Sequence, residues 1–172
     1  MDKRTVMLAY GLTLVGIFAR FVPHAPNVTP LVAVALFSGA HLPRRWAVWV
    51  PLCAVMISDA FIGCDRQTVF NWLGFALVGV VGFWLRERRS PVRILLAAAS
   101  SSTLFFLVSN FGVWWVGRLY PVTLVGLRQC YVAGIPFYRN MLAGDALYTA
   151  ALFGAFAMVC RWQRQPVIAY SK

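Results

Sequence analysis

The chain has 172 residues, of which 60% are hydrophobic and 12% are charged, and this composition excludes an ordinary soluble protein. The net charge of +11 does not indicate nucleic acid, because the basic residues stand in small clusters at the ends of apolar runs. We therefore expect a single transmembrane domain over residues 1–172, with the lipid bilayer as a partner and no nucleic-acid partner.

Six apolar segments follow one another along the chain, separated by Pro, Gly, Arg or Asn residues. A transmembrane helix needs roughly 17 to 25 apolar residues to cross a hydrocarbon core about 30 Å thick. We interpret the first segment as a span and not a signal peptide, since Arg20 follows it in place of a small-residue cleavage site. The sequence predicts an all-α, polytopic membrane protein with six transmembrane helices, at residues 5–22, 30–41, 46–62, 68–85, 94–116 and 137–160.

The basic residues predict the orientation of these helices. With six spans and a cytoplasmic N-terminus, 11 of the 16 Lys and Arg residues fall inside and 5 outside. The positive-inside rule therefore favours both termini in the cytoplasm. The outer residues on this assignment are Arg20, Arg66, Arg118, Arg128 and Arg139.

The second apolar segment is too short for a bilayer. Its residues 30–41 give a helix of about 18 Å, roughly 12 Å less than the hydrocarbon core. The irregular segment before it, residues 21–29, is therefore expected to re-enter the membrane, where such backbone must be buried in protein or line a wet cavity. We expect an outward-facing pocket walled by Arg20, His24 and Asn27; the alternative is a purely structural plug.

Polar residues of the other spans gather in their outer halves. Charged groups inside membrane helices are costly, and they are candidates for function by default. Asp145 lies about 8 residues, or roughly 12 Å, into the last predicted span and needs a partner from another helix or from the Arg20 loop. A structural Asp–Arg clamp is the alternative. The predicted ligand-binding residues are Arg20, His24, Asn27, Asp59, Asn110, Arg139, Asn140 and Asp145.

The longest outer loop, residues 117–136, carries Leu124, Leu127 and Tyr131 at helical spacing. This pattern predicts an interfacial helix before the sixth span. Such a helix could cover the pocket as a lid, or it could lie on the lipid headgroups.

Two of the four cysteines, Cys64 and Cys130, fall in the predicted outer loops. The alternatives for them are a disulfide between these two loops or a free Cys64 that ligates a metal or a metal-bearing ligand. The sequence contains no nucleophile elbow, zinc-protease motif, C-x-x-C pair or phosphate-binding glycine loop. We therefore expect neither an enzyme nor a bound cofactor, and no ATP hydrolysis within this chain.

Several stretches carry a family resemblance, among them "PHAPNVTPLVAVALFSGA" (23–40), "VPLCAVMISDAFIG" (50–63) and "GDALYTAALFG" (144–154). With them, the chain resembles an uncharacterised family of small bacterial integral membrane proteins, and this implies the bacterial inner membrane. Members are distantly similar to the S components of energy-coupling-factor transporters. That similarity implies six helices, an outward-facing pocket for a vitamin or metal ion, and docking on an energising module. The A-x-x-x-A docking face of S components is absent from the first span.

The leading hypothesis is an S-component-like protein that binds a small polar molecule, vitamin-like or metal-containing, in an outward-facing pocket for uptake. Arginines that reach an outward cavity favour anionic groups. The alternative is a non-catalytic accessory subunit that stabilises a larger membrane complex through its aromatic faces.

Overall fold

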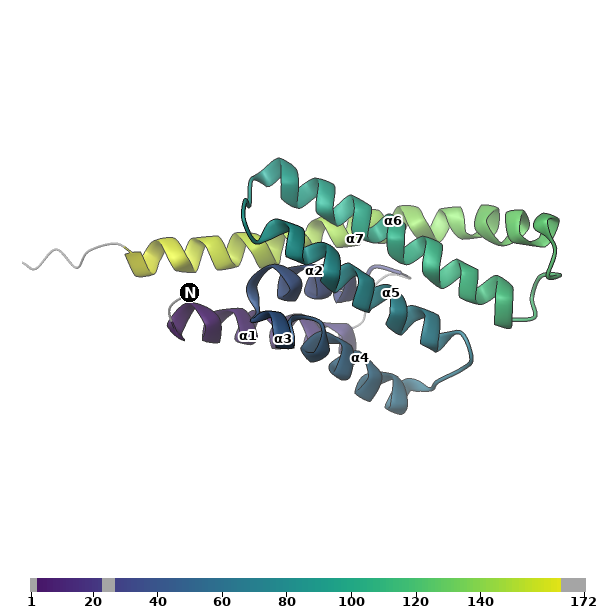
Figure 1. Cartoon of the computed structure of the whole chain (residues 1–172), viewed down its shortest axis with the longest axis horizontal. Coiled ribbons are helices and arrows are strands. Elements are labelled where there is room, and N and C mark those ends of the chain that lie inside the picture. Colours follow the sequence, from purple (N-terminus) through teal and green to yellow (C-terminus); the bar gives the residue numbers. More distant parts are fainter. Residues whose placement is uncertain (1–2, 23–26, 165–172) are drawn as a thin grey trace, which may run out of the picture.

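The structure is a computed structural model of the chain, and it describes residues 3–22 and 27–164. Every regular element within these residues is helical, so the predicted all-α class is confirmed. In chain order (Figure 1), the α-helices and the 3₁₀ turns, labelled η, are α1 Lys3–Phe18, η1 Ala19–Phe21, α2 Leu31–His41, α3 Arg44–Ala47, α4 Trp49–Ile62, α5 Thr68–Val81, η2 Gly82–Leu85, α6 Pro91–Val116 and α7 Leu124–Arg164.

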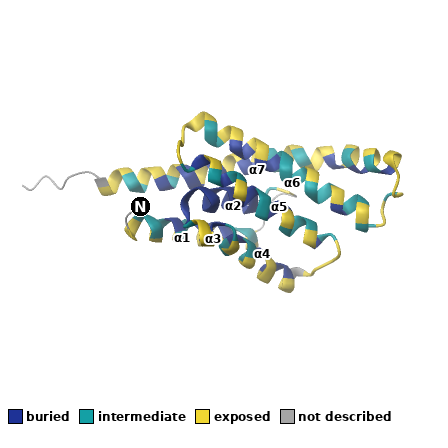
Figure 2. Ribbon diagram, in the orientation of Figure 1, coloured by how far each residue is buried: buried dark blue, intermediate teal, exposed yellow. Residues whose placement is uncertain are grey.

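Helix α2 forms the centre of the bundle. All 11 of its residues are buried, and α1, α4, α5, α6 and α7 all pack against it. Figure 2 shows α2 dark blue along its length, whereas the surrounding helices expose one side. A helix that is apolar all round is stable only when it is covered on every side. The short second segment is therefore the core of the molecule.

Two glycines, Gly39 on α2 and Gly82 in η2, allow α2 to pack backbone to backbone against the end of α5 and η2. A Cβ atom added at Gly39 would collide with the carbonyl oxygen of Gly79, and one added at Gly82 would collide with the carbonyl oxygen of Leu36. Small residues at such crossings permit the close approach on which packing between membrane helices depends. The crossing holds α2 against the end of α5 and η2.

The C-terminal third of the chain differs from the prediction. The expected interfacial helix and the sixth span, which we predicted to begin at Phe137, form one continuous helix of 41 residues with Pro136 inside it. At 1.5 Å per residue, α7 is about 62 Å long, roughly twice the hydrocarbon thickness. Packing against α6 explains its continuity, since Tyr131 Oη donates a hydrogen bond of 2.7 Å to the carbonyl oxygen of Leu107 across the two helices.

The remaining predicted segments agree with the helices to within a few residues, except that the third divides into α3 and α4. Within the described residues, four helical stretches are long and apolar enough to cross a membrane, namely Lys3–Phe21, Thr68–Leu85, Pro91–Val116 and Leu124–Gln163. The chain therefore has the helices of a membrane protein. The α2 and α4 helices, of 11 and 14 residues, are shorter, so helix length alone does not establish six spans.

The bundle has two distinct ends (Figure 1). The α4–α5 and α6–α7 connections lie together at one end, here called the connection end. The start of α1 and the end of α7 lie at the opposite end, here called the terminal end.

Candidate functional site

A cavity of about 500 Å³ lies at the connection end, over the first turn of α2. Residues from η1, α4, α5, α6 and α7 and from the segment before α2 line it. The lining is partly polar and partly apolar or aromatic, and the apolar and aromatic part is here called the floor. The polar residues are Arg20, Asn27, Thr29, Asp59, Gln67, Asn71, Ser109 and Asn110, and the floor includes Leu31, Val32, Phe75, Phe105, Val113, Phe137 and Met141.

A second cleft of about 430 Å³ adjoins this cavity, because Arg20, Asp59, Gln67 and Asn71 line both. The cleft also includes Gly63, Cys64, Asp65 and Thr68, which belong to the α4–α5 connection and the start of α5. The cavity and the cleft thus share a wall at the connection end.

An ion pair fixes one wall of the cavity. Arg20 Nη2 lies 2.5 Å from Asp59 Oδ1, and Arg20 Nη1 donates to Ser58 Oγ at 2.5 Å. Trp72 Nε1 donates to the other carboxylate oxygen of Asp59 at 2.8 Å. The side chains of Arg20 and Asp59 are 17% and 10% exposed, so water screens the pair only weakly. These contacts tie η1, α4 and α5 together at the mouth of the cavity.

The start of α2 contributes a positive electrostatic potential. Leu31 and Val32 line the cavity, and the first hydrogen bond to Pro30 O comes from Val34 N, so the amide groups before it have no partner within the helix. A helix N-terminus carries a partial positive charge that favours anions.

The other end of α2 is neutralised. Arg86 Nη2 donates to Leu42 O at 2.6 Å, and Arg89 Nη2 donates to Ala40 O at 2.9 Å. Burial is the main cause that lowers the pKa of both guanidinium groups. The negative end of the helix dipole is therefore compensated by two arginines, and the positive end is left facing the cavity.

The predicted site residues are distributed unevenly. Arg20, Asn27, Asp59 and Asn110 line the cavity, and His24 lies outside the described residues. The exposed residues Arg139 and Asn140 do not line it, and neither does the buried Asp145.

Four further residues line the cavity but were not among the predicted ligand-binding residues, namely Asn71, Ser109, Gln67 and Thr29. The signal for Asn71 and Ser109 was their position near the same ends of the predicted helices as Asp59 and Asn110. Within the described residues the side chains of Gln67 and Asn71 form no hydrogen bond, so their amide groups can bind a ligand.

Asp145 lies deeper in the bundle than the cavity. Its side chain is 1% exposed, and Ser102 Oγ lies 2.6 Å from its Oδ2 atom. The expected cationic partner is not found in the part of the chain that the structure describes, where the ion pair joins Arg20 to Asp59. The Asp–Arg clamp given as the alternative for Asp145 is therefore wrong, and Arg20 pairs with Asp59 instead.

The cysteines are all free, so the alternative of a Cys64–Cys130 disulfide is wrong in this structure. Cys130 is buried in α7, and its thiol donates to Asn110 O at 3.4 Å, whereas Cys64 is exposed in the α4–α5 connection. Over residues 3–22 and 27–164, no group of three or more His, Cys, Asp or Glu side chains is placed to hold a metal ion.

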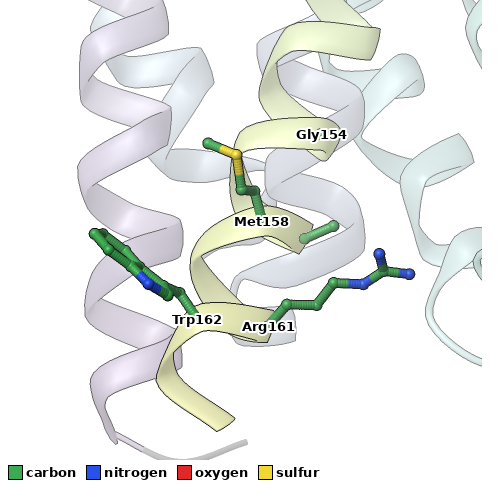
Figure 3. Close-up of a pocket in the computed structure, with 5 residues that line it drawn as sticks. Gly154, Met158, Arg161 and Trp162 are labelled. Carbon is green, nitrogen blue, oxygen red and sulfur yellow. The ribbon is translucent and has the colours of Figure 1, made fainter. Parts of the chain in front are cut away.

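A groove of about 660 Å³ at the terminal end is of a different kind. Among the described residues its lining comes from α7, and Figure 3 shows Met158, Arg161 and Trp162 projecting from the helix near Gly154. Met158 and Trp162 are 68% and 78% exposed, as expected for side chains that face lipid. The groove lacks the convergent polar groups that line the cavity at the connection end.

Comparison with known proteins assigns a family but no activity. No curated protein and no solved structure matches the chain. The family DUF6580, described as a family of unknown function, matches residues 1–168, and the chain therefore belongs to that family.

Proposed function

We propose that the protein is a multi-pass membrane protein that captures a small polar molecule in the cavity at the connection end for uptake. The observation that carries this proposal is the cavity itself, because polar groups from separate elements converge on it. Its volume of about 500 Å³ is within the range of roughly 300–1,000 Å³ for small-molecule sites. The protein acts as a binding protein and not as an enzyme.

The lining favours a ligand with an acidic group and a flat or apolar body. The N-terminus of α2 favours a carboxylate or phosphate, because the charge of Arg20 is already paired with Asp59, and the amides of Gln67 and Asn71 offer hydrogen bonds. Phe75 and Phe105 form a tilted pair with ring centroids 4.5 Å apart in the cavity floor, and this surface suits a ring. A vitamin-like acid has this combination.

In this proposal the connection end faces the outside of the bacterial inner membrane, and both termini are cytoplasmic. The basic residues support this orientation, because they gather where the chain passes from α2 to α4 and from η2 to α6. These residues are Arg44 and Arg45 in α3, Arg86, Arg88 and Arg89 between η2 and α6, and Arg93 in the first turn of α6. All six apolar segments lie within the bilayer, with α2 shielded by the others. Such an arrangement suits an S-component-like protein that docks on an energising module.

Native mass spectrometry of the protein purified in detergent tests the binding role. We expect a co-purifying small molecule, and we expect Asn71→Leu and Ser109→Ala to weaken its retention at least tenfold. Arg161→Gln, which changes only the groove at the terminal end, is the matched control and should retain the small molecule as the wild-type protein does. Equal retention in all variants would show that the cavity is not the site.

A second candidate function is that of an accessory subunit in a larger membrane complex. The α6–α7 hairpin extends beyond the α4–α5 connection (Figure 1), and near its tip Phe111 and Trp115 are stacked with ring centroids 6.0 Å apart. These rings are 40% and 54% exposed. Foreign subunits that stay bound in the same mass spectra, without a small molecule, would favour this candidate.

A further inference from the structure

A second polar group lies directly below the cavity floor. It consists of Asp145 and Thr149 on α7 and Ser101 and Ser102 on α6, all of them at most 1% exposed. Asp145 follows the floor residue Met141 by four positions, which places it one helical turn, about 6 Å, deeper. Ser101 stands in the same relation to the floor residue Phe105. The cavity and the buried carboxyl are therefore separated by a single turn of each helix.

The contacts around Ser102 favour a protonated Asp145 carboxyl group. Ser102 Oγ lies 2.6 Å from Asp145 Oδ2 and 3.0 Å from Ala98 O. A hydroxyl group has one hydrogen, so Ser102 cannot donate to both oxygen atoms. Both contacts are satisfied if the Asp145 carboxyl donates to Ser102 Oγ and Ser102 donates to Ala98 O. A protonated carboxyl group therefore satisfies both contacts, whereas an ionised one leaves Ser102 a single hydrogen for two acceptors.

The surroundings of Asp145 provide no compensating charge. Helix α7 packs against α6, α2 and α1, and no titratable or charged group on these elements forms an ion pair or hydrogen bond with Asp145 within the described residues. A buried carboxylate without a cationic partner is costly, so the neutral acid is the favoured form. The titratable and charged residues on these helices, none of which contacts Asp145 in this way, include Tyr10 on α1, His41 on α2, Arg93 on α6, and Tyr138, Arg139 and Tyr148 on α7.

Two hydroxyl groups beside this carboxyl are unsatisfied. Ser101 Oγ and Thr149 Oγ1 are buried and have no hydrogen-bond partner among the described residues. Thr149 lies one turn from Asp145 on the same face of α7, and Ser101 is adjacent to Ser102. Buried hydroxyls without partners are rare in folded proteins, and they can relay a proton because each can donate and accept.

We propose that Asp145 is a proton-binding site coupled to the cavity, so that the charge of whatever occupies the cavity controls whether the carboxyl holds its proton. This inference rests on the proposed binding role of the cavity. An anion in the cavity favours the protonated carboxyl, and by linkage the proton strengthens binding of the anion by the same factor.

Infrared spectroscopy tests the protonation without any knowledge of the ligand. The purified protein has only five Asp and Glu residues, which makes the C=O stretching band of a protonated carboxyl group assignable. We expect this band at neutral pH in the wild-type protein and its absence in Asp145→Asn, whose amide can still donate to Ser102. Glu87→Gln, which changes an exposed carboxylate, is the control and keeps the band. A band unchanged by Asp145→Asn would overturn the proposal.

A charged side chain in the cavity floor tests the coupling. Met141→Lys places a cation one turn above the carboxyl, and at about 6 Å with an effective dielectric constant of about 20 it should weaken proton binding roughly a hundredfold. The band should then disappear at a pH about two units lower in Met141→Lys than in the wild-type protein, and at an unchanged pH in Met141→Leu. Gel filtration confirms that both variants are folded.

The results separate this inference from the proposed function. If the band is present but Met141→Lys leaves it unchanged, the carboxyl is not coupled to the cavity and the proposal is wrong. If cavity substitutions release the co-purified molecule but no band is assignable to Asp145, the proposed binding function stands. Only the proton site is then refuted.

Discussion

At the scale of single residues, the pair Arg20–Asp59 decides the shape of the cavity mouth. Both oxygens of the Asp59 carboxylate are occupied, one by Arg20 and the other by Trp72. Removal of one partner from a weakly solvated pair leaves the other charge uncompensated, so the loss exceeds the net contribution of the pair itself.

We expect Asp59→Ala to lower the free energy of unfolding by about 1.5–3 kcal/mol, the range for hydrogen bonds to charged groups. Trp72→Phe, which keeps an aromatic ring but removes one donor, should cost about 1 kcal/mol. Thermal and denaturant unfolding in detergent measure both changes. The explanation would be wrong if Arg20→Gln in the Asp59→Ala background cost as much again, since paired residues are not additive.

At the scale of elements, the crossing of α2 and α5 depends on glycine. The atoms that a Cβ at Gly39 would meet belong to the backbone of α5 and η2, which cannot move aside as a flexible side chain can. In contrast, a Cβ at Gly154 on α7 would meet nothing within 4 Å. Substitution at Gly39 therefore tests the packing of α2 against α5 and η2, whereas substitution at Gly154 tests only the low helix propensity of glycine.

Gly39→Ala should destabilise the protein by about 3 kcal/mol or more, because the collision forces the two helices apart. Gly154→Ala should have the opposite sign and stabilise by up to about 1 kcal/mol through helix propensity. Melting temperatures of the two variants in the same detergent give the comparison. Similar shifts at both sites would show that the α2–α5 contact is looser than the structure has it.

Sequence reasoning was successful for elements whose signals are local. Thr68–Leu85 was predicted as one segment, and it corresponds to α5 with η2. The prediction failed for α7, where Pro136 and the polar residues around it indicated a boundary. Proline ends helices when the freed carbonyl has only solvent or lipid nearby, but it is tolerated in a helix interior that neighbours support.

At the scale of the whole molecule, the orientation of the protein in the membrane can be tested, because its two ends differ. The connection end carries the cavity, and the terminal end carries both the start of α1 and the end of α7. Cys64 is exposed at the connection end, and Ser90 is exposed in the connection between η2 and α6. One reporter position is thus available on each side.

We expect a membrane-impermeant maleimide to label Cys64 in intact spheroplasts when the other three cysteines are replaced by Ser. In the matched variant Cys64→Ser with Ser90→Cys, labelling should require permeabilised membranes, because the positive-inside rule puts that connection in the cytoplasm. Labelling of Ser90→Cys alone in intact cells would reverse the orientation, and the cavity would then open to the cytoplasm.

The sequence by itself determined the features that are encoded within short windows of the chain. Hydrophobic runs and their punctuation predicted an all-helical protein, the bounds of most helices, and the end at which polar residues such as Asp59 and Asn110 gather. These features follow from composition and local backbone preference, which act between near neighbours.

Only the tertiary structure decided which of those residues meet. It paired Arg20 with Asp59 rather than with Asp145, covered α2 on all sides, and extended α7 without a break alongside α6. Residues 20 and 59 are separated by 38 intervening positions in the sequence, and no local pattern specifies which of several acids an arginine will reach. The close packing of helices at glycines such as Gly39 makes that choice, because it sets the distance between every pair of side chains across the bundle.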